Sequence, residues 1–244
     1  MTTKSNIEWT EMTWNPTVGC TKISPGCKYC YADTMAHRLQ SMEARGYENG
    51  FRLTLMPERL EQPLNRQKPT VYFVNSMSDL FHDKVPFDYI ERIFEVMRRA
   101  EQHTFQVLTK RAERMAAFCR GRTVPANVWL GVSVENRKHG VPRIDVLHGV
   151  DATVRFLSVE PLLEDIGTIN LQGIHWVIVG GESGRKARPM REEWIASIKR
   201  QCDRARVPFF FKQWGAWGRD GEKRSKKANG RNYLGKTWDA MPSL

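Results

Sequence analysis

The sequence predicts an α/β fold with a parallel sheet, either a partial or a complete β/α barrel of six to eight strands. Three observations predict it. Short apolar segments recur along the chain, amphipathic helical patterns separate them, and most of the segments are apolar at both odd and even positions. Helices between strands provide the crossovers of a parallel sheet, whose strands are buried on both faces. A doubly wound open sheet is the alternative.

The individual elements follow from the spacing of apolar residues. Residues 51–55 alternate with period two, and the later expected strands are continuous apolar runs. The expected strands are 51–55, 71–74, 105–108, 128–132, 155–157, 176–179 and 209–211, with 13–18 as a candidate eighth. Helical spacing predicts helices at 29–42, 87–100, 111–119 and 192–205.

These elements predict one barrel domain over residues 1–214, followed by a basic C-terminal extension over 215–244. Residues 219–236 hold seven Lys or Arg against two acids, a local charge of +5. Aromatic residues are interleaved with these cations, and they either stack nucleic-acid bases or pin the extension to the barrel. They are Trp214, Trp217, Tyr233 and Trp238.

The overall charge indicates a polyanionic partner. The chain has 38 Lys and Arg against 27 Asp and Glu, a formal net charge of +11. Nucleic acid is the favoured partner, because Lys and Arg contacts to phosphates release counterions; the alternative is a charge that serves solubility. Apolar runs are far shorter than the roughly 20 residues that span a bilayer. With no secretory signal pattern at the N-terminus, we expect a cytoplasmic protein without a membrane partner.

Three of the five cysteines form a metal-binding motif. Cys20, Cys27 and Cys30 have the spacing C-x6-C-x2-C within residues 19–31, the cysteine loop. Three thiolates can hold three irons of a [4Fe-4S] cluster and leave the fourth iron open to S-adenosylmethionine. A structural zinc site stays open as the alternative. Cys119 and Cys202 lie in amphipathic helices and are expected in the core.

Polar residues that follow the predicted strands are the candidate binding and catalytic groups. Binding sites of parallel β/α folds lie at the carboxyl ends of the strands. A Glu follows three of the predicted strands at nearly the same distance from the strand end, which indicates that these strand ends form one shared functional site. The candidates for cofactor binding are Ser76, Asp79, Ser133, Glu135, Gly180, Gly181 and Glu182. The candidates beside the substrate are Glu160, Lys212 and Gln213.

Several segments carry a resemblance to a known family. They include Thr13-Trp14-Asn15-Pro16, the cysteine loop, Asn75-Ser76-Met77-Ser78-Asp79, Gly180-Gly181-Glu182-Ser183-Gly184 and Lys212-Gln213-Trp214-Gly215. The chain resembles the phage- and prophage-encoded three-Cys-motif proteins of the radical S-adenosylmethionine type, which are distantly similar to spore photoproduct lyase. The resemblance implies a radical-SAM-like barrel, with Tyr29 near the adenine of the cofactor. The first cysteine gap is six residues here, whereas the usual radical pattern is C-x3-C-x2-C.

Two hypotheses of function follow. The first is a radical S-adenosylmethionine enzyme with a [4Fe-4S] cluster that repairs or modifies nucleic acid or a nucleotide by hydrogen abstraction. Such an enzyme needs a reductase or another electron donor. The second is a non-catalytic phage DNA-binding protein with a structural zinc or iron–sulfur site. A third hypothesis is an enzyme that acts on a substrate other than nucleic acid, in which case the positive charge serves only solubility.

Overall fold

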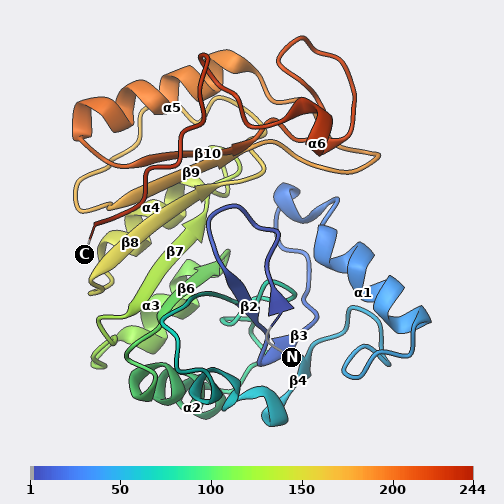
Figure 1. Ribbon diagram of the computed structural model, residues 1–244. Helices are drawn as coiled ribbons and strands as arrows, with labels where there is room; N and C mark the ends of the chain where they lie inside the picture. Colours follow the sequence, from blue (N-terminus) through green and yellow to red (C-terminus); the bar gives the residue numbers. More distant parts are fainter. Residues whose placement is uncertain (1–2, 244) are drawn as a thin grey trace. The chain divides into compact units, whose positions relative to one another are not determined.

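The strands of the main sheet follow one another in chain order. The computed structural model describes residues 3–243, and within them the sheet order is β1-β2-β5-β6-β7-β8-β9-β10 (Figure 1). These strands are β1 (Thr3–Lys4), β2 (Met12–Trp14), β5 (Val71–Val74), β6 (Thr104–Thr109), β7 (Val128–Ser133), β8 (Val154–Val159), β9 (Trp176–Gly180) and β10 (Phe209–Gln213). A doubly wound sheet reverses its order at a switch point. No such reversal occurs among the described strands, and the fold is the expected partial β/α barrel.

The predicted helices are present, and two further helices were not predicted. The helices are α1 (Tyr31–Ser41), α2 (Phe87–Arg99), α3 (Ala112–Cys119), α4 (Val141–His148), α5 (Glu192–Ala205) and α6 (Lys226–Asn229). Short 3-10 turns cover Pro25–Cys27, Pro57–Arg59 and Gln62–Asn65. In α4 a proline occupies the first turn, where its missing N–H has no helical partner to lose. None of the helices in residues 3–243 is long and apolar enough to cross a membrane.

The chain divides into two compact units, which are described separately. The first unit comprises the residues up to Ile23, together with Cys30–Gly131 and Val150–Thr153. The second comprises Ser24–Tyr29, Val132–Gly149 and the residues from Val154 onward. The cysteine loop therefore contributes residues to both units.

The first unit holds β2, β5 and β6 as parallel neighbours, with β1 antiparallel to β2. The strand predicted at 51–55 is shorter, and its place was wrong. It forms β4 (Thr54–Leu55), which pairs antiparallel with β3 (Thr17–Val18) in a separate two-stranded sheet. Its alternating pattern is the pattern of a half-exposed antiparallel strand, not of a buried parallel one. The first parallel strand is β2, which overlaps the candidate at 13–18 only at Thr13 and Trp14.

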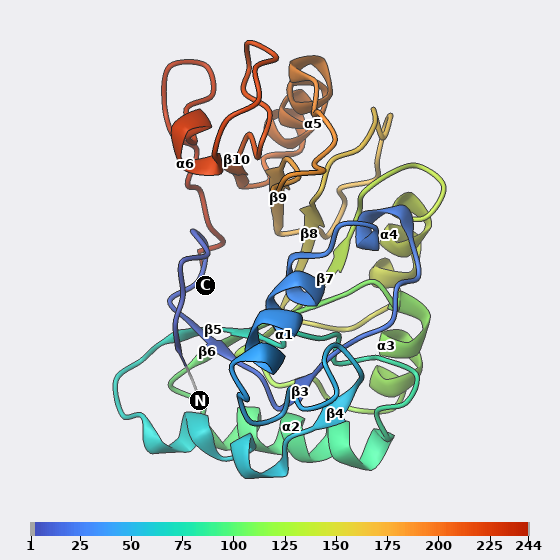
Figure 2. The same ribbon diagram turned by 90° about the vertical axis from the view of Figure 1, so that its right-hand side faces the viewer.

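A small apolar core joins α1 to this two-stranded sheet. Val18 of β3 packs with Ala32 and Ala36 of α1 and with Met56, which follows β4. Figure 2 shows α1 running beside β3 and β4. The helix begins later than predicted, since Cys30 is its N-cap residue. Cys27 lies in the preceding 3-10 turn and is outside the helix.

The second unit holds β8, β9 and β10 as parallel neighbours. All five residues of β9 are buried, as expected for a strand covered on both faces. The helix α5 buries Ile195, Ile198 and Cys202, and it lies beside β9 and β10 in both views (Figures 1 and 2).

The C-terminal segment folds against β10. Tyr233 is buried, and its ring lies 5.4 Å from that of Phe211, measured between centroids. Beyond it, the N–H of Phe211 donates to the carbonyl of Trp238, and Asp239 forms an antiparallel bridge with Phe210. The interpretation that aromatic residues pin this segment is confirmed for Tyr233.

Candidate functional site

The cysteine loop carries the accessible thiols. All five cysteines are reduced; Cys20, Cys27 and Cys30 are partly exposed, whereas Cys119 and Cys202 are buried. Burial raises the pKa of the Cys119 thiol to about 11 and that of Cys202 to about 12. Both thiols are therefore protonated and poor metal ligands at neutral pH. The prediction that these two are core residues is confirmed.

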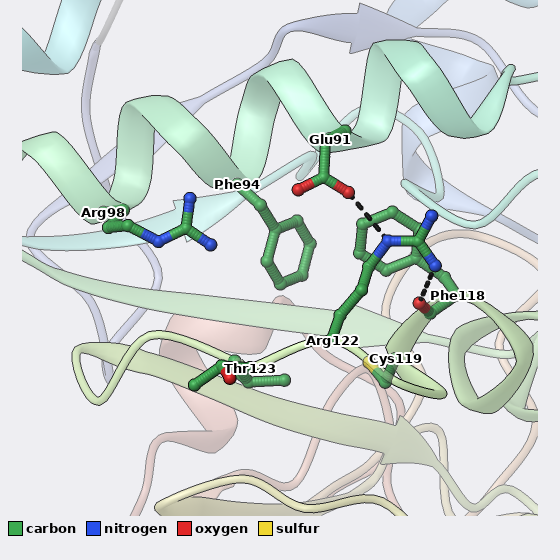
Figure 3. Close-up of a pocket in the computed structure, with 8 residues that line it drawn as sticks. Glu91, Phe94, Arg98, Phe118, Cys119, Arg122 and Thr123 are labelled. Atoms are coloured by element: carbon green, nitrogen blue, oxygen red, sulfur yellow. Dashed lines mark hydrogen bonds and ion pairs between the residues drawn. The ribbon is translucent and has the colours of Figure 1, made fainter.

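The surroundings of Cys119 are structural. It lines a small hollow with Phe94 of α2 and Phe118 of α3, and Arg122 closes one side (Figure 3). The Nε of Arg122 lies 2.8 Å from a carboxylate oxygen of Glu91, and its Nη1 donates to the carbonyl of Phe118. These contacts join Arg122 to both helices, α2 and α3.

A tight backbone turn places Cys20 after β3. Gly19 has a φ of +79°, and a Cβ at this position would lie 2.2 Å from the carbonyl oxygen of Arg52. The N–H of Cys20 donates to the carbonyl of Phe51 at 3.1 Å. A glycine is required here, because any side chain would collide with the backbone beside it.

A buried arginine contacts Cys20 directly. Arg111, which follows β6, donates from Nη1 to the Sγ of Cys20 at 3.6 Å and to a carboxylate oxygen of Asp79 at 3.1 Å. Its Nη2 donates to the carbonyl oxygen and the hydroxyl of Thr21 at 3.2 and 2.9 Å. Burial lowers the pKa of Arg111, but Asp79 and Cys20 outweigh it and the pKa is raised overall. The positive charge beside Cys20 favours its thiolate, the form that binds metal.

Asp79 is the anchor of this arginine. One carboxylate oxygen accepts from the hydroxyl of Thr109 at 2.7 Å and from the N–H of Phe81 at 3.0 Å, and the other accepts from the N–H of Lys110 at 3.1 Å. With Arg111 as well, both oxygens are committed. In this conformation Asp79 orients Arg111, and binding a cofactor directly would require one of these contacts to break.

Ser76 lies in a different part of the first unit's strand ends. Its hydroxyl donates to the side-chain oxygen of Asn15 at 3.2 Å, and the same oxygen accepts from the N–H of Met77 at 3.0 Å. The hydroxyl of Tyr31 donates to the carbonyl of Ser76. Asn15 thus fixes the turn that follows β5, a role that the sequence analysis did not assign to it.

In the second unit, Glu135 is fully buried after β7. Its carboxylate lies 2.7 Å from Nη1 of Arg143, which also donates to the carbonyl of Ser133. Gly26 of the cysteine loop packs against this Glu, and a Cβ there would lie 3.1 Å from the Cγ of Glu135. Arg143 comes from the unpredicted helix α4, so the sequence analysis missed this ion pair.

Glu182, after β9, is paired in the same manner. Arg188 donates from Nε and Nη2 to the two carboxylate oxygens of Glu182, at 2.8 and 2.5 Å. Its Nη2 also donates to the carbonyl of Pro25 at 3.0 Å, and its guanidinium lies 5.3 Å from the centre of the Tyr29 ring. The hydrogen bond to Glu182 raises the pKa of Arg188, so this arginine stays charged. Glu182 therefore fixes the position of Arg188, and Arg188 in turn binds the cysteine loop at the carbonyl of Pro25.

Glu160, after β8, faces Lys212 of β10. The ammonium lies 3.2 Å from a carboxylate oxygen of Glu160, and both side chains are partly exposed. Gly180 leaves the space that this carboxylate occupies, since a Cβ there would lie 2.2 Å from it. The amide of Gln213 donates to the hydroxyl of Ser183 at 3.1 Å. A partly exposed carboxylate beside an ammonium can accept or supply a proton.

The strand ends of the second unit are linked by backbone hydrogen bonds. The N–H of Leu163 donates to the carbonyl of Glu135, and the N–H of Leu162 donates to the carbonyl of Gly180. Gly181 lies so close to β10 that a Cβ would come within 1.9 Å of the Trp214 carbonyl. The three strands thus deliver their glutamates to adjoining loops, and each glutamate has a basic partner.

Within residues 3–243, no three His, Cys, Asp or Glu side chains are arranged so that they could hold a metal ion. A hollow of about 540 Å³ lies in the C-terminal segment, and none of the strand-end glutamates lines it. Its two arginines are neutralised, Arg219 by Glu192 and Arg224 by Asp220. The roles assigned to the strand-end residues and to the three cysteines of the loop stay predictions.

Solved structures of spore photoproduct lyase resemble this chain in fold. A single-residue variant of that enzyme has 10% sequence identity and a TM-score of 0.50, with 88% of this chain and 79% of that chain covered. A complex with a dinucleoside spore photoproduct has 11% identity and a TM-score of 0.47, with 82% of this chain covered. This chain spans 63% of the length of that one. The first likeness shows a shared fold alone.

Curated proteins give no match to this sequence. The profile of one family, described as "Protein of unknown function (DUF5131)", matches residues 4–242. The match covers both units, the cysteine loop and all of the strand ends described above. The chain therefore belongs to the DUF5131 family.

Proposed function

We propose that this protein is an iron–sulfur enzyme of the radical S-adenosylmethionine type that acts on nucleic acid or a nucleotide. The observation that carries the proposal is the cysteine loop itself. Its three cysteines are the accessible thiols, and two arginines near the strand ends hold the loop, the buried Arg111 at Cys20 and the partly exposed Arg188 at Pro25.

The chemistry of the three thiols suits an iron–sulfur cluster, although within residues 3–243 they are not gathered into a ready-made metal site. Thiolates are the usual ligands of iron–sulfur clusters. The guanidinium of Arg111 places a positive charge beside the thiol of Cys20. Cys20, Cys27 and Cys30 would hold three irons, and the cofactor S-adenosylmethionine would take the fourth. When bound, such a cluster would supply one-electron chemistry for reductive cleavage of the cofactor. A reductase or another donor would provide the electron.

The residues of the chain then have definite tasks. Ser76, Asp79, Ser133, Glu135 and Glu182 would shape the cofactor site, and the last two do so chiefly by fixing their arginines. Gly180 leaves room for the carboxylate of Glu160 and Gly181 for the carbonyl of Trp214 beside this site, and Tyr29 would lie against the adenine. Glu160 and Lys212 would hold or move a proton at the substrate, with Gln213 beside them.

The fold and the charge support the class of substrate. A spore photoproduct lyase has the same fold, and the net charge of +11 suits a phosphate backbone. Repair or modification of a nucleic acid is therefore the proposed activity, in a phage or prophage setting.

Anaerobic reconstitution with iron and sulfide tests the proposal. We expect about four irons and four sulfides per chain, and release of 5′-deoxyadenosine from S-adenosylmethionine after reduction. Cys27→Ala should lose the iron, whereas the matched variant Cys119→Ala should keep it. Zinc at one equivalent without cofactor cleavage would instead support a structural metal site in a DNA-binding protein.

A further inference from the structure

A loop and a hairpin of the second unit are fastened together beside the cysteine loop. Residues 184–188 follow Glu182, and residues 216–224 turn back on themselves through an antiparallel bridge between Trp217 and Lys223. The indole N–H of Trp217 donates to the carbonyl of Ala187 at 2.7 Å, and the ammonium of Lys223 donates to a loop carbonyl at 2.5 Å. We call residues 184–188 and 216–224 the loop–hairpin surface.

This surface carries excess positive charge. It holds six Lys or Arg against two acids, a net charge of +4. Arg185, Lys186 and Lys223 are exposed, and in the part of the chain that the structure describes none of them has an acidic partner. The contact of Lys223 to a neutral carbonyl leaves its charge uncompensated. Arg219 and Arg224, in contrast, are neutralised by acids.

The surface borders the candidate site through Arg188. That residue belongs to the same loop, donates to the carbonyl of Pro25 and faces the ring of Tyr29. Lys28 lies over the same ring at 5.4 Å and is exposed, so it adds a further cation at this border. A chain of phosphates bound along the surface would thus pass the Cys27 segment of the loop.

We propose that the loop–hairpin surface binds the phosphate backbone of a nucleic acid, through Arg185, Lys186 and Lys223, and so presents the substrate to the cysteine loop. This inference deepens the proposed function and rests on it for the class of substrate. Guanidinium and ammonium groups match phosphates in charge and hydrogen bonding. Among residues 3–243, no large exposed apolar side chain falls in this surface, which disfavours insertion into a lipid layer.

The test compares two triple variants of the full chain that lose the same charge. The first is Arg185→Gln/Lys186→Gln/Lys223→Gln. The control removes three exposed cations elsewhere, Lys68→Gln/Arg120→Gln/Arg204→Gln. Binding of a fluorescein-labelled 20-nucleotide single strand is measured by anisotropy between 50 mM and 1 M salt, with circular dichroism and iron content as checks of folding and cluster loading.

The expected result is a selective change of the salt dependence. Each phosphate contact on a single strand contributes about 0.7 to the slope of log K against log salt, so three contacts contribute roughly two. The first variant should bind about a hundredfold more weakly at 0.1 M salt and converge with the wild type near 1 M. The control should keep the wild-type slope.

Three outcomes would overturn the inference. They are a wild type that does not bind the oligonucleotide, equal losses in both triple variants, and binding to anionic vesicles without binding to the oligonucleotide. Failure of the proposed chemistry looks different. A wild type that binds the strand through these residues but releases no 5′-deoxyadenosine keeps the surface and rejects the reaction.

Discussion

Replacing Arg111 with Gln removes a buried charge from the most enclosed ion pair of the first unit. The side chains of Arg111 and Asp79 are 6% and 9% exposed. Removing one partner of a buried ion pair lowers the free energy of unfolding by about 3–5 kcal/mol, because the charge of the other partner is left uncompensated. Asp79 keeps three donors, the hydroxyl of Thr109 and two backbone N–H groups, so Arg111→Gln should fall near the lower limit, about 3 kcal/mol.

Removing the acidic partner of this ion pair should lower the free energy of unfolding by more than removing the arginine does. Asp79→Asn leaves the Arg111 charge with the neutral oxygens of Thr21 and with the exposed carboxylate of Asp83 at 3.8 Å, and we expect the free energy of unfolding to fall by about 4 kcal/mol. The double variant should cost less than the sum of the two single changes, with a coupling of about 1–3 kcal/mol. Arg122→Gln is the control, since its pair with Glu91 is roughly half exposed and should contribute about 1 kcal/mol or less.

Urea unfolding of the metal-free chain, followed by tryptophan fluorescence, measures these costs. Reconstitution then measures iron per chain. Arg111→Gln should also lower iron retention, because it removes the contact to Cys20, whereas Asp79→Asn retains Arg111 itself. The reasoning is refuted if Arg111→Gln is no more costly than Arg122→Gln, or if the double variant is strictly additive.

Three further predictions follow from burial and close packing. Alkylation of the native metal-free chain at pH 8 should modify the cysteine loop and spare Cys119 and Cys202, whose pKa values are raised by burial; peptide mass spectrometry reads this out. Burial lowers the pKa of His175, so the unfolded chain binds a proton first as pH falls below about 6.5, and stability is lost. His175→Asn should flatten the fall in unfolding free energy between pH 7 and 5, measured by urea unfolding at each pH. Gly181→Ala should destabilise the chain by about 2 kcal/mol in urea, because its Cβ meets a backbone carbonyl, whereas Gly149→Ala, with 3.5 Å to its nearest neighbour, should change stability by less than about 0.5 kcal/mol.

The parallel strands were predictable because a strand that is buried on both faces has a continuous run of apolar residues in the sequence. The runs at β7 and β9 are apolar except for Ser133 at the end of β7, and every residue of both strands is buried. The pairing of β4 was not predictable, because an alternating pattern describes a half-exposed strand without naming its partner. The helix α4 was missed because it has eight residues and a proline in its first turn.

In the candidate site, too, some residues were predictable from the sequence and others were not. The glutamates after β7, β8 and β9 were found from their offsets, since strand ends are where parallel folds place polar groups. Their partners depend on the tertiary structure. Arg111 meets Asp79 across 32 residues, and Arg143 reaches Glu135 from α4. Sequence reasoning therefore identifies the carboxylates, but it does not show that each one is already bound to a base.

The pairing of the C-terminal segment with β10 has a consequence for how the protein is handled. Residues 238–240 lie along the edge of a strand made of Phe209, Phe210 and Phe211, and the carbonyl of Ala240 also accepts from the indole of Trp176. Shortening the chain before Trp238 would expose a row of open backbone donors and acceptors on an aromatic strand. Such an edge is a template for another chain to add to, so the shortened protein should self-associate into aggregates.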